Sequence, residues 1–329
     1  MNKARYFRGL KGNQVRCELC PHGCVIKDNG YGICGIRKNE KGVLYAETYG
    51  KVSAAAVDPM EKKPLYHFFP GRDILSFGTI GCNFKCPYCQ NWQISQGTNT
   101  PVSYLSPEEA VQTALDKKIG FIAYTYSEPL IWYEWVLDTA SLARKKNIRN
   151  VAVTNGYLNK EPLEELYPFI DAMNIDVKAF NEKFYRELCQ ARLDKVLETV
   201  EFLHDKVHIE LTMLVIEGWN DDLGEIGKFC DWVRGLDPGI PVHFSRYFPQ
   251  YRFDQAATSL ETLKKIYDTA REKLRYVYIG NASLEGADNT FCPRCKNLLV
   301  ERKGYIVHGK GLRKNKCSQC GEKADFLNE

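Results

Sequence analysis

The sequence GCNFKCPYCQNW, residues Gly81–Trp92, carries three cysteines in the pattern C-x3-C-x2-C. A closed zinc site uses four protein ligands, and a bacterial ferredoxin motif places a fourth cysteine three residues after the third. Here the next cysteine after Cys89 is Cys189, about a hundred residues later. Three thiolates can instead bind three irons of a cubane [4Fe–4S] cluster and leave one iron open to a substrate. The alternative is a zinc knuckle that takes a distant fourth ligand.

The residue before the last of these cysteines is aromatic, Tyr88, so the full pattern is C-x3-C-x-aromatic-C. This pattern resembles the cluster loop of the radical S-adenosylmethionine (SAM) enzymes. The resemblance implies that Cys82, Cys86 and Cys89 are catalytic cysteines that hold a [4Fe–4S] cluster. It also implies that the open iron binds the amino and carboxylate groups of SAM, close to Tyr88.

The composition is that of an ordinary globular chain: 329 residues, 44% hydrophobic and 26% charged. No apolar run approaches the roughly 20 residues that cross a bilayer, so we expect no membrane partner. The N-terminal sequence lacks the apolar core of a signal peptide, which predicts a cytoplasmic protein. Thirteen cysteines in such a chain indicate metal binding or redox chemistry rather than disulfides.

The cysteines fall into groups that predict three modules: residues 1–70, 71–285 and 286–329. The last module has two C-x2-C pairs separated by about twenty residues, a spacing typical of a zinc ribbon or rubredoxin-like knuckle. The first module fits no common zinc finger closely, and zinc and an auxiliary cluster both stay open there, with His22 as a further candidate ligand. The expected outer metal ligands are Cys17, Cys20, Cys24 and Cys34 in the first module, and Cys292, Cys295, Cys317 and Cys320 in the last.

The middle module alternates strand-like and helix-like segments, which favours a parallel sheet. Strands are expected within 73–81, 120–126, 147–156, 171–180, 207–216 and 241–249. Helices are expected near 106–118, 129–146, 161–167, 195–204, 225–233 and 259–274, the first of them begun by Ser106 and Pro107. This number of units predicts an α/β fold, a partial (β/α) TIM-like barrel with small cysteine-rich metal modules at both ends. A doubly wound open sheet is the alternative.

Polar residues lie where the expected strands end, and in barrels the active site is built at the carboxyl ends of the strands. Asp176 and Lys178 are two residues apart on one strand and therefore face the same side, either toward a ligand or as an internal ion pair. Glu128 is the natural acceptor for the amino group of SAM. The expected cofactor-binding residues are Tyr88, Ser127, Glu128, Asn155, Asp176, Lys178 and His243.

Several further segments resemble the pyruvate formate-lyase activase-like group of radical SAM enzymes. They are CELCPHGCVIKDNGYGICGIRKN (17–39), VDPMEKKPLYHFFPG (57–71), YTYSEP (124–129), TNGY (154–157) and NIDVKAF (174–180). Within that group, the first segment and the tail NTFCPRCKNLLVERKGY (289–305) are most similar to the enzymes of the AmmeMemoRadiSam system. The chain departs from activases in having Val153 before the TNG motif and Tyr126-Ser127 in place of two glycines.

The resemblance implies a 5′-deoxyadenosyl radical, an electron donor such as flavodoxin or ferredoxin, and Memo-like and AMMECR-like partner proteins. It favours a protein substrate, as for the activating enzymes of glycyl radical enzymes. Radical modification of a small molecule or RNA is the second hypothesis, and a non-catalytic zinc protein is the third. The tail from Phe291 onward has nine Lys and Arg against four Asp and Glu, which leaves nucleic acid open as a partner.

Other single residues have two interpretations each. Cys189 could donate a hydrogen atom near a radical site or be a buried structural cysteine, and Cys230 fits a core position. His67 and the pair Lys62-Lys63 could line the substrate entrance or belong to an exposed linker.

Overall fold

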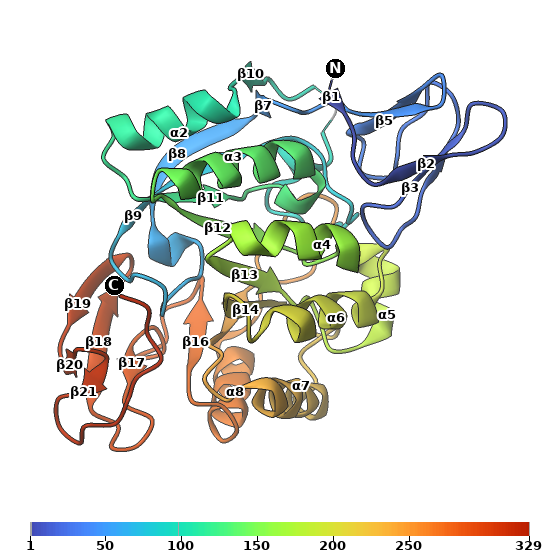
Figure 1. Cartoon of the computed structure of the whole chain (residues 1–329). Helices are drawn as coiled ribbons and strands as arrows, with labels where there is room; N and C mark the ends of the chain where they lie inside the picture. The colour runs from blue at the N-terminus through green and yellow to red at the C-terminus, as the bar shows by residue number, and fades with distance from the viewer. Residues whose placement is uncertain (1, 98, 329) are drawn as a thin grey trace.

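The structure is a computed structural model that describes residues 2–97 and 99–328. Its centre is an eight-stranded sheet with the order β16-β15-β14-β13-β12-β11-β9-β8 (Figure 1). Neighbouring strands from β9 to β16 are parallel, and β8 pairs antiparallel with β9 at one edge. The strands are β8 (Ala54–Pro59), β9 (Asp73–Gly78), β11 (Phe121–Tyr124), β12 (Arg149–Thr154), β13 (Ala172–Asp176), β14 (His208–Val215), β15 (Val242–Arg246) and β16 (Val277–Gly280).

Helices connect the parallel strands, as a (β/α) barrel requires, and Figure 1 shows α3 and α4 lying across the sheet. The first long helix, α2, begins as the sequence predicts: Ser106 Oγ accepts from the Glu109 N–H, and the Glu109 carboxylate accepts from the Ser106 N–H. The helices are α1 (Trp92–Ser95), α2 (Pro107–Asp116), α3 (Tyr133–Lys145), α4 (Lys160–Leu166), α5 (Glu182–Phe184), α6 (Leu193–Leu203), α7 (Leu223–Leu236) and α8 (Leu260–Arg271). The predicted partial barrel is confirmed.

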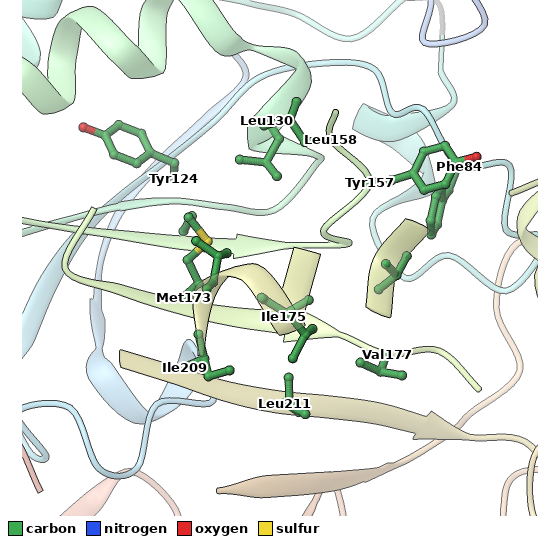
Figure 2. Close-up of a cluster of buried hydrophobic side chains, with 14 of the residues drawn as sticks. Phe84, Tyr124, Leu130, Tyr157, Leu158, Met173, Ile175, Val177, Ile209 and Leu211 are labelled. Atoms are coloured by element: carbon green, nitrogen blue, oxygen red, sulfur yellow. The ribbon is translucent and has the colours of Figure 1, made fainter. Parts of the chain in front are cut away.

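The barrel core is built from apolar side chains of neighbouring strands. Met173 and Ile175 on β13 lie beside Ile209 and Leu211 on β14 (Figure 2), and all four are 3% exposed or less. The register of β13 on β14 pairs Met173 with Ile209 and Ile175 with Leu211. Strands buried on both faces need such apolar runs, which explains why these segments could be recognised in the sequence.

Small sheets flank the barrel at opposite ends of the molecule (Figure 1). The sheets of residues 2–46 have the orders β1-β6-β5 and β2-β3-β4, and β7 pairs with β10; the tail has β17-β18-β19 and β20-β21. Their strands are β1 (Asn2–Lys3), β2 (Phe7–Gly9), β3 (Val15–Cys17), β4 (Val25–Ile26), β5 (Arg37–Glu40), β6 (Val43–Ala46), β7 (Lys51–Val52), β10 (Ser103–Tyr104), β17 (Thr290–Phe291), β18 (Leu298–Lys303), β19 (Ile306–Gly309), β20 (Leu312–Arg313) and β21 (Lys316–Cys317). The module boundaries near 70 and 285 stay predictions.

The tail is joined to the barrel by buried polar contacts. Arg302 on β18 is 2% exposed and donates to the Tyr66 carbonyl at 2.7 Å and to Thr290 Oγ1 at 2.8 Å. The Leu327 N–H donates to the His67 carbonyl, and Phe68 forms a parallel bridge with Leu327. Residues 66–68 and the tail therefore pack as one unit. No helix in residues 2–97 and 99–328 is long and apolar enough to cross a membrane.

Candidate active site

A cavity of about 530 Å³ opens at the carboxyl ends of the barrel strands. It extends from the cysteine loop to Lys62 and Lys63 and to Tyr305 in the β18–β19 hairpin. The predicted residues that line it are Cys82, Cys86, Tyr88, Cys89, Ser127, Glu128, Asn155, Asp176 and Lys178. The structure therefore brings together residues from the loop after β9 and from the ends of β11, β12 and β13.

The cysteine loop has a backbone that requires glycine at its first position. Gly81 has φ +87°, and a Cβ there would lie 2.7 Å from the Cys34 carbonyl oxygen. The Phe84 N–H donates to Cys82 Sγ at 3.3 Å, and Ser95 Oγ lies 3.2 Å from Cys89 Sγ. Hydrogen bonds of this kind stabilise thiolates and tune the metal they hold.

Two hydroxyl groups of the cavity wall indicate what kind of ligand the cavity suits. Ser127 Oγ and Thr212 Oγ1 are buried and have no hydrogen-bond partner within the described part of the chain. Both residues line the cavity. A buried hydroxyl without a partner is costly, so this wall is suited to a ligand with polar groups. With the three cysteines beside them, the residues present fit a [4Fe–4S] cluster with SAM.

Glu128 lines the same cavity and is fixed by three donors. Its Oε1 accepts from Thr154 Oγ1 at 2.6 Å and from the Leu130 N–H at 2.9 Å, and its Oε2 accepts from the Asn155 N–H at 2.8 Å. Burial raises the pKa of Glu128 to about 7, against these hydrogen bonds, which lower it. A carboxylate has about four lone-pair sites, so one is left to accept from a ligand in the cavity.

Asp176 and Lys178 form an ion pair, with Lys178 Nζ 2.6 Å from Asp176 Oδ2. Burial alone would lower the pKa of Lys178, but the neighbouring Asp176 carboxylate outweighs it and the pKa is raised. The two side chains also line the cavity. The pair thus combines the two interpretations of the sequence: an internal ion pair that also faces the cavity.

Cys189 lies behind the cysteine loop. Its Sγ is 3.7 Å from Cys86 Sγ and 3.5 Å from Tyr88 Oη, and it is fully buried. The contact with the Cys189 thiol, together with Lys178, lowers the pKa of Cys86 to about 7, against burial, which raises it. Among the described residues, the cavity wall does not include Cys189. Cys189 therefore contacts Cys86 from behind the loop, and its sulfur does not face the cavity where a substrate would bind.

A charged group centred on Asp58 was not found from the sequence. Lys62 Nζ and Lys63 Nζ lie 2.8 and 2.7 Å from its carboxylate, and the Tyr126 hydroxyl also donates to it. These hydrogen bonds outweigh burial and lower the pKa of Asp58, whereas burial lowers the pKa of Lys63. Tyr126 has φ +69°, a conformation unusual for a non-glycine residue, and its ring lies 4.6 Å from Lys63 Nζ. Lys62 and Lys63 lie four and five residues after Asp58, whereas Tyr126 reaches it from 68 residues further along the chain.

His243 and His67 lie elsewhere. His243 Nε2 is 2.7 Å from Glu210 Oε2, and His208 Nε2 is 3.0 Å from the other oxygen of Glu210. His67 contacts the Asp325 carbonyl and the Tyr278 hydroxyl, and burial lowers its pKa to about 3. Neither His243 nor His67 belongs to the cavity wall in the part of the chain that is described. The structure thus separates His243 from the other predicted cofactor-binding residues, because it is the second residue of β15 and lies toward the amino end of the strand.

The outer cysteines form two separate groups. In the tail, the sulfurs of Cys292, Cys295, Cys317 and Cys320 all lie within 4.8 Å of one another. The N-terminal thiols of Cys17, Cys20, Cys24 and Cys34 influence one another electrostatically. Cys230 is fully buried in α7, as expected of a core residue.

Comparison with known proteins agrees with this geometry. Residues 77–230 match the Radical SAM superfamily. The chain is 42% identical to the protein MJ0808 of Methanocaldococcus jannaschii over 99% of this chain and 100% of that protein. With its fold and its three-cysteine loop, the chain belongs to the radical SAM superfamily.

More distant similarities extend to several kinds of enzyme. A GTP 3′,8-cyclase of Thermodesulfovibrio yellowstonii is 28% identical over 51% of this chain, which spans 53% of that enzyme. A putative glycyl-radical enzyme activating enzyme of M. jannaschii, MJ1632, is 25% identical over 53% of this chain and 68% of its own length. The structure of Streptococcus suis SuiB bound to S-adenosylmethionine superposes with a TM-score of 0.51 at 15% identity, over 67% of this chain and 52% of SuiB. The last similarity concerns the fold alone.

Proposed function

We propose that this protein reductively cleaves SAM at a [4Fe–4S] cluster held by Cys82, Cys86 and Cys89 and removes a hydrogen atom from a substrate. The observation that carries the proposal is the single cavity that joins three cysteines with the unpartnered hydroxyls of Ser127 and Thr212. When SAM is bound to a reduced cluster of this kind, the chemistry supplied is a 5′-deoxyadenosyl radical.

The residues of the chain have the task of binding and orienting SAM. Glu128 is expected to accept a hydrogen bond from its amino group through the remaining lone pair. Lys178, held by Asp176, presents a cation to the same cavity. The unpartnered hydroxyls would find their partners on the polar groups of SAM. Filling the cavity would also exclude water from the reacting atoms.

For the substrate, we propose a segment of a partner protein, as for activating enzymes of glycyl radical enzymes. The similarity to MJ1632 supports this. So does the entrance of the cavity, where Tyr305 is 56% exposed and Lys62 is partly exposed. We further propose that the protein belongs to the AmmeMemoRadiSam group, acts with Memo-like and AMMECR-like proteins, and receives electrons from flavodoxin or ferredoxin.

The central test is anaerobic formation of 5′-deoxyadenosine from SAM by the reconstituted protein. Alanine at Cys82, Cys86 or Cys89 is expected to abolish it, because the cluster needs all three thiolates. Cys230→Ala is the matched control, since Cys230 is a buried cysteine of α7 and should leave the reaction intact. Product formation at the parent rate by the loop variants would contradict the proposal.

A deuterium-labelled candidate partner protein tests the substrate. Transfer of deuterium into 5′-deoxyadenosine, with product formation stimulated by the partner, is the expected result. Lys62 and Lys63 on the cavity wall, and the similarity to a GTP 3′,8-cyclase, favour a small anionic molecule or RNA as the second candidate. Label arriving from such a compound, and none from proteins, would replace the first proposal by the second.

In the tail, we propose a structural zinc ion. Cys292 and Cys320 sulfurs are 3.6 Å apart, as are those of Cys295 and Cys317. Four thiolates at zinc–sulfur distances of about 2.3 Å lie roughly 3.8 Å from one another in a tetrahedron. The observed spacing supports a closed site for one ion.

A further inference from the structure

The four N-terminal cysteines converge on one point although they span residues 17–34. A Cβ built at Gly32 would lie 3.7 Å from Cys34 Sγ and 3.8 Å from Cys24 Sγ. The Cys17 N–H donates to the Cys24 carbonyl at 2.9 Å and the Gly23 N–H donates to the Cys20 carbonyl at 3.1 Å, so the segment that carries Cys17 and Cys20 folds back onto Cys24. All four are free thiols. They therefore form one site with four sulfur ligands.

The spacing of these sulfurs differs from that in the tail. The four cysteines of the tail have sulfurs that all lie within 4.8 Å of one another, and they are the group of this kind among the described His, Cys, Asp and Glu residues. The N-terminal thiols do not form such a group, and neither do the three cysteines of the loop 82–89. Around a single zinc ion adjacent sulfurs would be about 3.8 Å apart. A cubane cluster instead binds each thiolate to a different iron, which requires a wider arrangement.

A buried cation lies against this site. Arg37 is 1% exposed, and its guanidinium donates to Glu134 at 2.9 and 3.2 Å. Its Nε has no hydrogen-bond partner in residues 2–97 and 99–328. The charge of Arg37 acts on the thiols of Cys17 and Cys34. An unpartnered donor next to thiolates suits a centre that takes up additional negative charge on reduction.

Backbone donors around the sulfurs add to this environment. The N–H groups of Leu19, His22 and Ile36 hydrogen-bond to Cys17, Cys20 and Cys34, respectively. Such hydrogen bonds are among the factors that set the reduction potential of iron–sulfur clusters.

The site also touches the cysteine loop of the active site. His22 Nε2 lies 2.8 Å from the carbonyl oxygen of Asn83, the residue after Cys82. The Cys34 carbonyl approaches Gly81, the residue before Cys82, so closely that only glycine fits there. From Cys20, a path of one N–H···S hydrogen bond, the His22 side chain and one further hydrogen bond thus reaches the loop.

We propose that Cys17, Cys20, Cys24 and Cys34 hold a [4Fe–4S] cluster that relays single electrons to the active-site loop. In each transfer the N-terminal cluster is oxidised by one electron and the cluster at the loop is reduced by one. No bond is made or broken, and no proton moves. A low-potential one-electron donor of the flavodoxin or ferredoxin class reduces the N-terminal cluster again. The relay rests on the proposed function, whereas the cluster site itself does not.

The metal content of a protein without the active-site cluster tests the site. A variant with alanine at Cys82, Cys86 and Cys89 is reconstituted anaerobically with iron, sulfide and zinc. About four irons and four sulfides per chain are expected, with an electron paramagnetic resonance signal after reduction by dithionite. Zinc at both outer sites and no iron would overturn the proposal. Cleavage of SAM by the parent protein with dithionite is measured separately, so failure of the site and failure of the proposed function are distinguishable.

The relay is tested with Cys20→Ser/Cys24→Ser in the otherwise complete protein. Iron should fall from about eight to about four per chain, and SAM cleavage driven by reduced flavodoxin should be lost while cleavage driven by dithionite is retained. Flavodoxin-driven cleavage at the parent rate, with the iron lost, would overturn the relay. Should this variant fail to fold, His22→Ala keeps all four cysteines: retained iron with slowed reduction of the loop cluster supports the relay, and unchanged reduction contradicts it. His204→Ala, on the outer surface after α6, is the matched control for His22→Ala.

Discussion

The carboxyl group of Glu128 predicts a specific pH dependence of SAM binding. With a pKa of about 7, it is mostly protonated at pH 6 and mostly ionised at pH 8. If the ionised form accepts the hydrogen bond from SAM, the dissociation constant should be about tenfold larger at pH 6 than at pH 8 from this group alone. Glu128→Gln removes this titration. It should also weaken binding at pH 8 by roughly tenfold to a hundredfold, because a hydrogen bond to a charged group is lost.

The assay is equilibrium binding of SAM to the anaerobically reconstituted parent and Glu128→Gln proteins from pH 6 to 8. The amino group of SAM titrates in both experiments, so the ratio of the two dissociation constants isolates Glu128. Iron content is the control, since Glu128 does not contact the cysteine sulfurs and the cluster should assemble in both proteins. A ratio that stays constant with pH, or binding by the variant as tight as that of the parent, would refute the role of Glu128.

The same pKa has a consequence for stability. In the folded protein the pKa of Glu128 is about 7, which is above the ordinary pKa of a glutamate side chain. Between these two pKa values the folded protein therefore keeps a proton on Glu128 that the unfolded chain has lost. The contribution of Glu128 to the free energy of unfolding is therefore fully present below the ordinary pKa and is lost as the pH rises through 7. The total loss is about 3 kcal/mol. The thermal midpoint of Glu128→Gln should lack this decline. A parallel decline in both proteins would place the titrating group elsewhere.

Three further predictions concern other contacts. Lys178→Met leaves Asp176 without its partner and should raise the dissociation constant of SAM by about tenfold or more, with unchanged iron; unchanged affinity would exclude contact between this pair and SAM. Cys292→Ser should reduce zinc by about one ion per chain and speed amide hydrogen exchange in β18 and β19; zinc content equal to that of the parent would contradict a structural site in the tail. Arg302→Met should lower the free energy of unfolding by about 3 kcal/mol because buried acceptors lose their donor, whereas Arg302→Lys should lose less; equal stability of parent and methionine variant in denaturant titration would show that the buried contacts contribute little.

The sequence was sufficient for the parts of the fold that depend on local patterns. Apolar runs such as the one containing Met173 and Ile175 identify buried strands, and Ser106 with Pro107 identifies the start of α2. β8 and β16 were not predicted as strands of the barrel. β8 (AAAVDP) is short of large apolar residues and has an exposed stretch, and β16 has only four residues, so neither has a strong periodic signal.

The candidate site could be predicted only where its residues belong to compact motifs. The three cysteines and the Ser127-Glu128 segment are such motifs. Thr212 and Tyr305 reach the cavity from β14 and from the tail, and nothing in their neighbouring residues distinguishes them from ordinary strand and hairpin positions. His243 illustrates the opposite case. Its place in a late strand predicts a position at the rim, but its partner is Glu210 on the neighbouring strand, a contact that depends on the register of β14 and β15.

The contacts between residues 66–68 and the tail impose an order on the synthesis of this protein. His67 and Phe68 are completely buried, but part of their cover, including Phe326 and Leu327, lies about 260 residues further along the chain. A chain that emerges from its amino end at about 5–20 residues per second therefore exposes these aromatic side chains for tens of seconds. During that time the Cys82–Cys89 loop has already emerged, while Tyr305, which lines the same cavity from the tail, has not. Insertion of iron and sulfur can therefore begin on an open barrel, before the tail completes it.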